Sequence, residues 1–169
     1  TDAGCYFGTY YRIAEEGDTE WTWTYGLADQ AYGVILRYTG QASSGFIHAS
    51  DITVQASPTN TPTAPNVAYT DLEAGSLCLQ VFGSDEDYIY TTPVQLTERY
   101  NDISNTGDGT CGGAGGDKVI SGTGNTGTAE FTMSGADQWV AVTVIIEAEE
   151  AEEVHIPVSG IGVGDPMIL

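Results

Sequence analysis

Asp117 lies in a sequence context that suggests calcium binding. Residues 112–120, GGAGGDKVI, match the calcium-binding repeat G-G-x-G-x-D-x-U-x, with Asp117 as the ligand and Val119 as the inward apolar side chain. Such repeats bind calcium between successive turns, yet the next nine residues carry Thr126 where the aspartate should stand. We therefore interpret 112–120 as a glycine-rich loop and keep Asp117 as a candidate ligand.

Asp85 and Asp87 are the other candidate calcium ligands. They flank Glu86, and calcium prefers carboxylate oxygens held in loops. Asp102 and Asp108 add two carboxylates, but their spacing matches no EF-hand. A solvated acidic loop is the stronger interpretation, so we predict no cofactor and retain calcium only as a candidate.

Catalytic patterns are weak throughout the sequence. A serine or cysteine nucleophile needs a base nearby, and the two histidines, His48 and His155, lie in no recognisable catalytic motif. Residues 122–127 match GxGxxG, but a predicted strand follows where a dinucleotide site requires a helix. We predict that the protein is not an enzyme and assign no catalytic residues.

Three aromatic residues could form a sugar-binding platform. Trp21, Trp23 and Tyr25 alternate with threonine, so one face of a strand would carry all three rings. The same spacing describes a core face, and tryptophan is usually mostly buried. We favour the core interpretation and keep glycan binding as an alternative.

The charge balance limits the partners of the chain. Its 24 acidic residues against four basic ones give a formal charge of -20, which repels nucleic acid and anionic membranes. Cations, cationic surfaces and neutral sugars remain compatible. We see no signal peptide before Thr1 and no apolar stretch of the roughly 20 residues that a membrane span needs. We therefore expect a processed chain or one released without such a signal, as a virion protein is.

The three cysteines show no metal-binding spacing. Cys78 lies between two leucines, so we expect it to pack as a small hydrophobic residue. Cys5 and Cys111 could pair in an oxidising compartment, and the sequence leaves that pairing open.

Short alternating and β-branched runs predict an all-β fold. Residues 126–147, TGTAEFTMSGADQWVAVTVIIE, indicate two strands joined at Ser134-Gly135, and the run 139–146 is the candidate central strand. The proline-rich residues 57–66 predict a surface crossing between two sheets. The other predicted strands are residues 5–14, 20–25, 31–38, 52–55, 76–82, 87–91 and 93–99.

The C-terminal residues differ from the rest of the chain. Residues 148–153 are an acidic linker rich in glutamate, and residues 154–169 turn apolar again. An exposed apolar end is a liability, so we expect Val163, Met167, Ile168 and Leu169 to fill a sheet groove, either the chain's own or a neighbour's.

The order of several stretches resembles a β-sandwich module of tailed-phage structural proteins and secreted bacterial proteins. The resemblance covers about residues 5–147, implies a jelly-roll or immunoglobulin-like antiparallel sandwich, and brings no catalytic residues. It rests on YYRIA (10–14), GVILRYTG (33–40), the proline-rich crossing, SLCLQVFGSDED (76–87), GGAG (112–115) and residues 126–146.

The resemblance breaks at the first strand. Such modules usually open with an apolar strand, which here resembles the C-terminal residues GVGDPMIL (162–169). The chain could be circularly permuted, could be one unit of a tandem protein, or could donate this strand to the next subunit.

These observations predict a β-sandwich domain (1–147), an acidic linker (148–153) and a C-terminal strand segment (154–169). The predicted function is that of a structural subunit in an extracellular assembly, such as a capsid decoration, tail or fibre protein of a tailed phage. Its predicted partners are further copies or other virion subunits, without nucleic acid or membrane insertion. The alternatives are a non-viral extracellular filament built by strand donation and a secreted carbohydrate-binding module.

Overall fold

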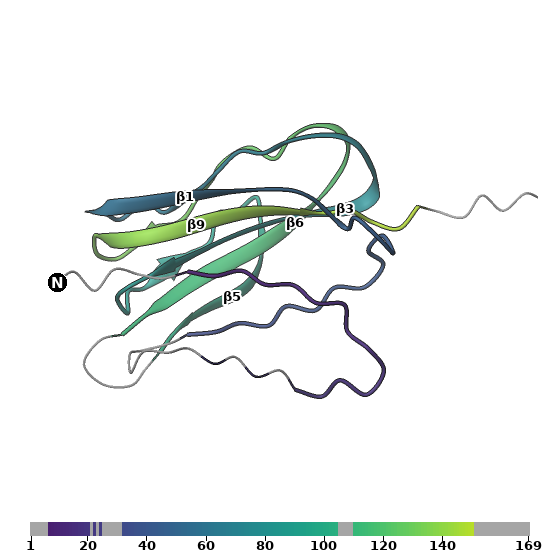
Figure 1. Cartoon of the computed structure of the whole chain (residues 1–169). Coiled ribbons are helices and arrows are strands. Elements are labelled where there is room, and N and C mark those ends of the chain that lie inside the picture. The colour runs from purple at the N-terminus through teal and green to yellow at the C-terminus, as the bar shows by residue number, and fades with distance from the viewer. Residues whose placement is uncertain (1–6, 21, 23, 25–31, 105–109, 151–169) are drawn as a thin grey trace, which may run out of the picture.

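A five-stranded antiparallel sheet forms the centre of the protein (Figure 1). The computed structural model describes residues 7–20, 22, 24, 32–104 and 110–150. The sheet has the order β1-β9-β3-β6-β5. Its strands are β1 (Ile47–Thr59), β3 (Ala68–Ser84), β5 (Thr97–Ile103), β6 (Gly112–Asn125) and β9 (Asp137–Ile146).

Four short strands build a second layer on one face of this sheet. β2 (Thr63–Ala64) pairs with β7 (Ala129–Glu130), and β4 (Tyr90–Thr91) pairs with β8 (Thr132–Met133). The main core lies between the layers and contains Ala64, Phe82, Tyr90, Leu96, Ala114, Ala129, Phe131, Met133, Trp139 and Ala141. The prediction of an all-β antiparallel fold is confirmed, and its jelly-roll or immunoglobulin-like topology stays a prediction.

Buried polar groups join the two layers. The Thr143 hydroxyl donates to the Pro65 carbonyl at 2.6 Å, and the Gln80 amide donates to the Gly127 carbonyl at 3.0 Å. Because a buried donor without a partner is costly, these bonds specify where each loop crosses the sheet.

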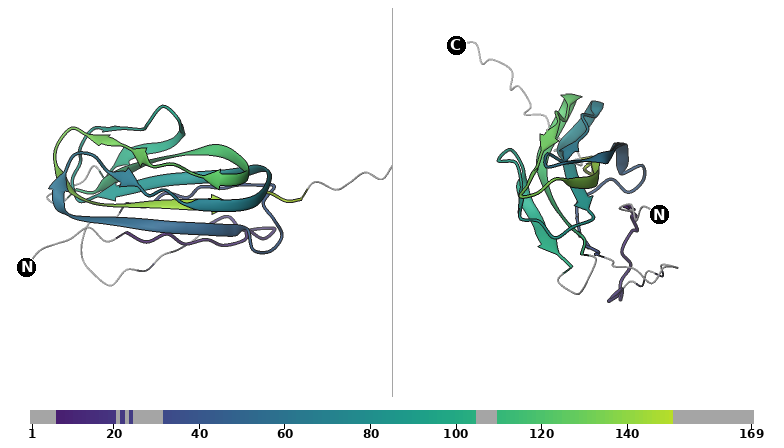
Figure 2. Two further views of the ribbon diagram at one scale, coloured as in Figure 1. Left: turned by 90° about the horizontal axis from the view of Figure 1, so that it is seen from above. Right: turned by 90° about the vertical axis from the view of Figure 1, so that its left-hand side faces the viewer.

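The N-terminal residues cover the other face of the sheet without forming strands. In the left view of Figure 2 they lie, in purple, on the side of the sheet opposite the short strands. Phe7 packs against Gly83, Tyr32 contacts Tyr100, and Tyr38 reaches Asp117. The described parts of the predicted strands 5–14, 20–25 and 31–38 therefore contain no strand. Their aromatic pattern reflects rings that pack on a sheet face, which does not require backbone pairing.

The glycine-rich stretch 112–120 is a strand, and its interpretation as a loop was wrong. It lies in β6 between β3 and β5, where neighbouring groups occupy the space of the missing side chains. A Cβ on Gly116 would stand 2.7 Å from the Thr97 carbonyl oxygen, and one on Gly115 would stand 2.5 Å from the Tyr100 ring. Glycine therefore allows the β5 backbone and the Tyr100 ring to lie close to the backbone of β6.

The prediction for residues 126–147 is confirmed for the second strand and the turn, whereas the first predicted strand is divided into β7 and β8, which pair with β2 and β4. β7 and β8 precede a turn, and β9 follows and pairs with both β1 and β3, which makes it a central strand. β9 is rich in β-branched residues, and Val140 and Val142 are buried on the face of the N-terminal segment, opposite the core face of Trp139 and Ala141.

Several predicted boundaries shift. Residues 52–55 and 76–82 are parts of the longer β1 and β3, and the proline-rich crossing contains the end of β1 and all of β2. Only Tyr90–Thr91 of 87–91 forms a strand, and the strand predicted at 93–99 begins at Thr97. Register shifts in β3 and β5 explain part of the difference, because a bulge breaks the alternation that sequence patterns detect.

A Gly116→Ala substitution should lower the free energy of unfolding by about 1–3 kcal/mol, since the added methyl group would meet the backbone oxygen of Thr97. Gly33→Ala is the matched control, because nothing lies within 4 Å of its Cβ position. Urea denaturation of both variants measures the difference. Equal stabilities would contradict the close approach at β6.

Candidate functional site

Asp117 lies at the centre of a buried polar cluster with Tyr38 and Arg99, here called the Asp117 cluster. Its side chain is only 2% exposed and stands on β6, on the face covered by the N-terminal segment. Arg99 donates from Nε at 2.7 Å and from Nη2 at 2.9 Å to the two carboxylate oxygens, and the Tyr38 hydroxyl donates at 2.8 Å. Both oxygens are therefore occupied by protein donors.

The local structure explains how Arg99 reaches Asp117. Thr97 is the direct partner of Asp117, and a register shift between Glu98 and Tyr100 places Arg99 outside the regular ladder. Arg99 keeps 44% of its side chain exposed, so the pair is buried on the carboxylate side and hydrated on the guanidinium side. Such a fork holds a carboxylate in a defined orientation.

The pKa values of several groups on this face of the sheet are raised, those of Tyr38 and Arg99 in part by Asp117. Burial raises the pKa of Tyr38, and the hydrogen bond to Asp117 and its negative charge raise it further. The same hydrogen bond raises the pKa of Arg99. Burial raises the pKa of Tyr32 to about 12, with a smaller effect from the charge of Asp102. These groups therefore keep their protons at neutral pH, and the cluster joins the N-terminal segment to the sheet.

The three candidate calcium ligands do not converge. Asp117 lies opposite Leu79 of β3, whereas Asp85 and Asp87 follow the end of that strand. Six residues of strand separate the level of Asp117 from Asp85, or roughly 20 Å. Among the described residues, no three His, Cys, Asp or Glu side chains are placed to hold a metal ion.

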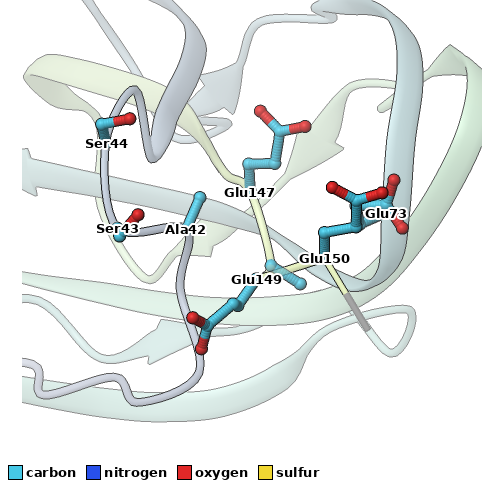
Figure 3. Close-up of a pocket in the computed structure, with 8 residues that line it drawn as sticks. Ala42, Ser43, Ser44, Glu73, Glu147, Glu149 and Glu150 are labelled. Carbon is cyan, nitrogen blue, oxygen red and sulfur yellow. The ribbon is translucent and has the colours of Figure 1, made fainter. Parts of the chain in front are cut away.

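An acidic pocket lies at the end of the sheet where β9 ends (Figure 3). Its carboxylates point in different directions: Glu149 is turned away from Glu73 and Glu150, while Glu147 lies 3.3 Å from the His48 ring. The pocket therefore presents negative charge without a shared centre. It is lined by Ala42, Ser43, Ser44, Glu73 and residues 147–150.

The outer edge of β1 carries exposed apolar side chains on a strand that has one unpaired side within the described part of the chain. Ile52 is 53% exposed and Val54 is 65% exposed, while their partners on β9, Val142 and Val140, are buried. No other strand of the described residues pairs with this edge. The edge faces the viewer in the left view of Figure 2. An apolar face thus continues from the middle of the sheet to an open edge.

The other predicted site residues lie outside the described part of the chain. They are Trp21, Trp23 and Tyr25 of the glycan alternative and Val163, Met167, Ile168 and Leu169 of the assembly segment. Cys5 also lies outside it, and Cys111 is a free cysteine in the structure, so no disulfide joins the described cysteines. Cys78 is fully buried, as expected, and burial raises its pKa to about 11.

Sequence reasoning missed the partners of Asp117. One signal was available. An aspartate within a buried glycine-rich strand needs a nearby cation, and the chain has only four basic residues that could supply one. Nothing in the spacing of Tyr38, Arg99 and Asp117 predicts their contact.

No family model, curated protein or solved structure matches this chain. The described residues include no helix that is long and apolar enough to cross a membrane. The function must therefore be argued from the geometry of the chain itself.

An Asp117→Asn substitution should destabilise the protein by about 1–3 kcal/mol, because the amide nitrogen would face a donor of Arg99 or Tyr38. Asp18→Asn is the control. The Asp18 carboxylate accepts a 2.9 Å bond from the Glu15 N–H, which an amide oxygen can also accept, and a 3.2 Å bond from the exposed Arg12, so the change should cost less than about 1 kcal/mol. Thermal unfolding measures both changes. A larger loss for Asp18→Asn would contradict the structural role of the Asp117 cluster.

Alkaline pH should weaken the fold through Tyr38. Its folded pKa is raised above the ordinary value of 10.0, so its contribution is complete below pH 10 and is lost as the pH rises through the folded pKa. Tyr38→Phe should therefore lose less stability above pH 10 than the wild type, measured by urea denaturation at each pH. Tyr10→Phe, at an exposed position, should follow the wild-type curve. Identical curves for all three proteins would contradict this assignment.

Proposed function

We propose that this protein is a non-enzymatic structural subunit of an extracellular assembly, most specifically a tailed-phage virion component such as a capsid decoration, tail or fibre protein. The observation that carries the proposal is the open apolar edge of β1. A 13-residue edge strand with exposed Ile52 and Val54 can pair with another chain. Soluble proteins normally guard such edges with lysine, proline or a covering loop. The single proline of β1, Pro58, lies near its end, beyond the residues up to Gln55 that pair in register with β9.

Charge explains why assembly would use this edge. The chain carries a formal charge of -20, so two copies repel each other over most of their surfaces. β1 contains one acidic residue, Asp51, and no lysine or arginine. An edge with a single carboxylate is therefore a place where two copies can approach without bringing many carboxylates together.

The Asp117 cluster supports a structural role as well. Its carboxylate is engaged by Arg99 and Tyr38, so its bonds join segments of one chain and leave little capacity for a ligand. The acidic pocket beside Glu147 has no convergent set of carboxylates (Figure 3). The open edge of β1 is thus the feature of the described surface that best fits an interaction.

An extracellular filament from a cellular organism is the alternative that the same edge favours. Strand pairing along β1 would serve a filament as well as a virion, because the bonds are between backbones. Electron microscopy of the native particle separates the two. A capsid or tail supports the virion proposal, whereas a free filament without other phage components overturns it.

The purified chain should associate reversibly, and association should strengthen with salt. Raising the salt from about 0.05 to 0.5 M shortens the screening length and weakens repulsion between acidic copies. Sedimentation velocity over a range of protein concentrations measures the effect. A chain that stays monomeric at every concentration and salt level would contradict a self-assembling subunit.

A further inference from the structure

We propose that the outer edge of β1 accepts the apolar segment 154–169 of a second copy as an added strand. This inference rests on the proposed function and names the two surfaces that join the copies. The acceptor is the stretch around Ile52 and Val54, and the donor is the segment that contains Val163 and Ile168.

The first support is the state of the acceptor edge. The Ile52 N–H donates to the Asp51 carboxylate at 2.8 Å, and the Gln55 amide donates to the Ser57 carbonyl at 3.0 Å. Side chains of β1 thus bond backbone groups of their own strand, which is expected where a second strand is missing. A donated strand would replace such local bonds with a ladder and would cover Ile52 and Val54.

The second support is the match in chemistry between the two segments. Residues 154–169, VHIPVSGIGVGDPMIL, contain one acidic residue, Asp165, and β1 also contains one, Asp51. The chain has 24 acidic residues in all. The donor and the acceptor therefore each carry fewer acidic residues than the chain average, and their contact brings few like charges together.

The third support is the direction in which the chain leaves the sheet. Glu147 N–H donates to the Phe46 carbonyl, Ala42 N–H donates to the Glu147 carbonyl, and Glu149 N–H donates to the Gly40 carbonyl. These bonds carry the chain beyond Ile146, which pairs with Ile47 at the start of β1. The chain therefore passes the end of the acceptor edge instead of turning along it.

A return of the same chain to its own β1 edge is disfavoured by residues 151–153. Their sequence, Ala-Glu-Glu, contains no glycine, proline or asparagine to form a tight turn. A reversal there would also bring Glu152 and Glu153 towards the acidic pocket formed by Glu73, Glu149 and Glu150. Both effects favour donation to a second copy.

The test uses three variants of the full chain. Val54→Lys blocks the acceptor, because a lysine on an edge opposes strand addition, and Ile168→Glu blocks the donor. Val119→Lys is the matched control: it makes the same change at a β-branched residue of similar exposure, 69% against 65%, on β6, which β9 and β3 separate from the β1 edge. Circular dichroism and thermal unfolding confirm that each variant folds.

Sedimentation equilibrium should show a dissociation constant at least about tenfold higher for Val54→Lys and Ile168→Glu, and within about twofold of wild type for Val119→Lys. An equimolar mixture of Val54→Lys and Ile168→Glu should form a one-to-one dimer that grows no further. This complementation follows because one variant keeps the donor and the other keeps the acceptor.

Two results would overturn the inference while leaving the proposed function intact. In the first, wild type and Val54→Lys assemble equally well. In the second, the equimolar mixture of Val54→Lys and Ile168→Glu assembles as far as the wild type does and forms no one-to-one dimer. A third result would show that the segment covers the β1 edge of its own chain. In that result the wild type is a monomer, and its amides at residues 50–54 are protected from hydrogen exchange but lose this protection in the Ile168→Glu variant. That outcome, or a chain that never associates, would overturn both proposals.

Discussion

The close approach of neighbouring groups to the β6 backbone is the constraint on which the rest of the structure depends. β6 lies between β3 and β5, and groups from both sides occupy the space that side chains would need: the ring of Tyr100, the carbonyl of Thr97 and the side chain of Leu96. Only glycine permits this distance. Because the strand also holds Asp117, the same constraint brings Arg99 on β5 within hydrogen-bonding reach.

The few positive charges of this acidic chain bond largely within it. Arg99 pairs with Asp117, Lys118 donates to the Thr126 carbonyl, and Arg12 contacts Asp18. Internal use of these groups leaves the outer surface strongly negative. A surface of this kind keeps copies apart in solution except where carboxylates are sparse, as along β1. The same charge distribution that makes most of the surface acidic thus leaves β1 as a stretch with few carboxylates.

The two faces of the central sheet are covered in different ways. Short paired strands close one face around Phe82 and Phe131, with backbone ladders and buried hydrogen bonds between the layers. On the other face, Phe7, Tyr32 and Tyr38 pack on β3, β5 and β6, and Ile52 and Val54 at the edge stay exposed. Among the described residues, these contacts of the N-terminal segment thus lie on strands away from the open edge of β1.

The sequence alone determined the all-β class, the turn and the second strand within residues 126–147, the central place of β9 and the burial of Cys78, because alternation and β-branched runs are local signals. Only the tertiary structure decided that the glycine run is a strand, that residues 7–14 and 32–38 are not strands, and that Asp117 binds Arg99 and Tyr38. Aromatic residues follow similar patterns whether they pair as strands or pack on a sheet face. Glycine likewise favours loops until neighbours from distant segments fill the space beside it, and contacts of that range leave no mark in local spacing.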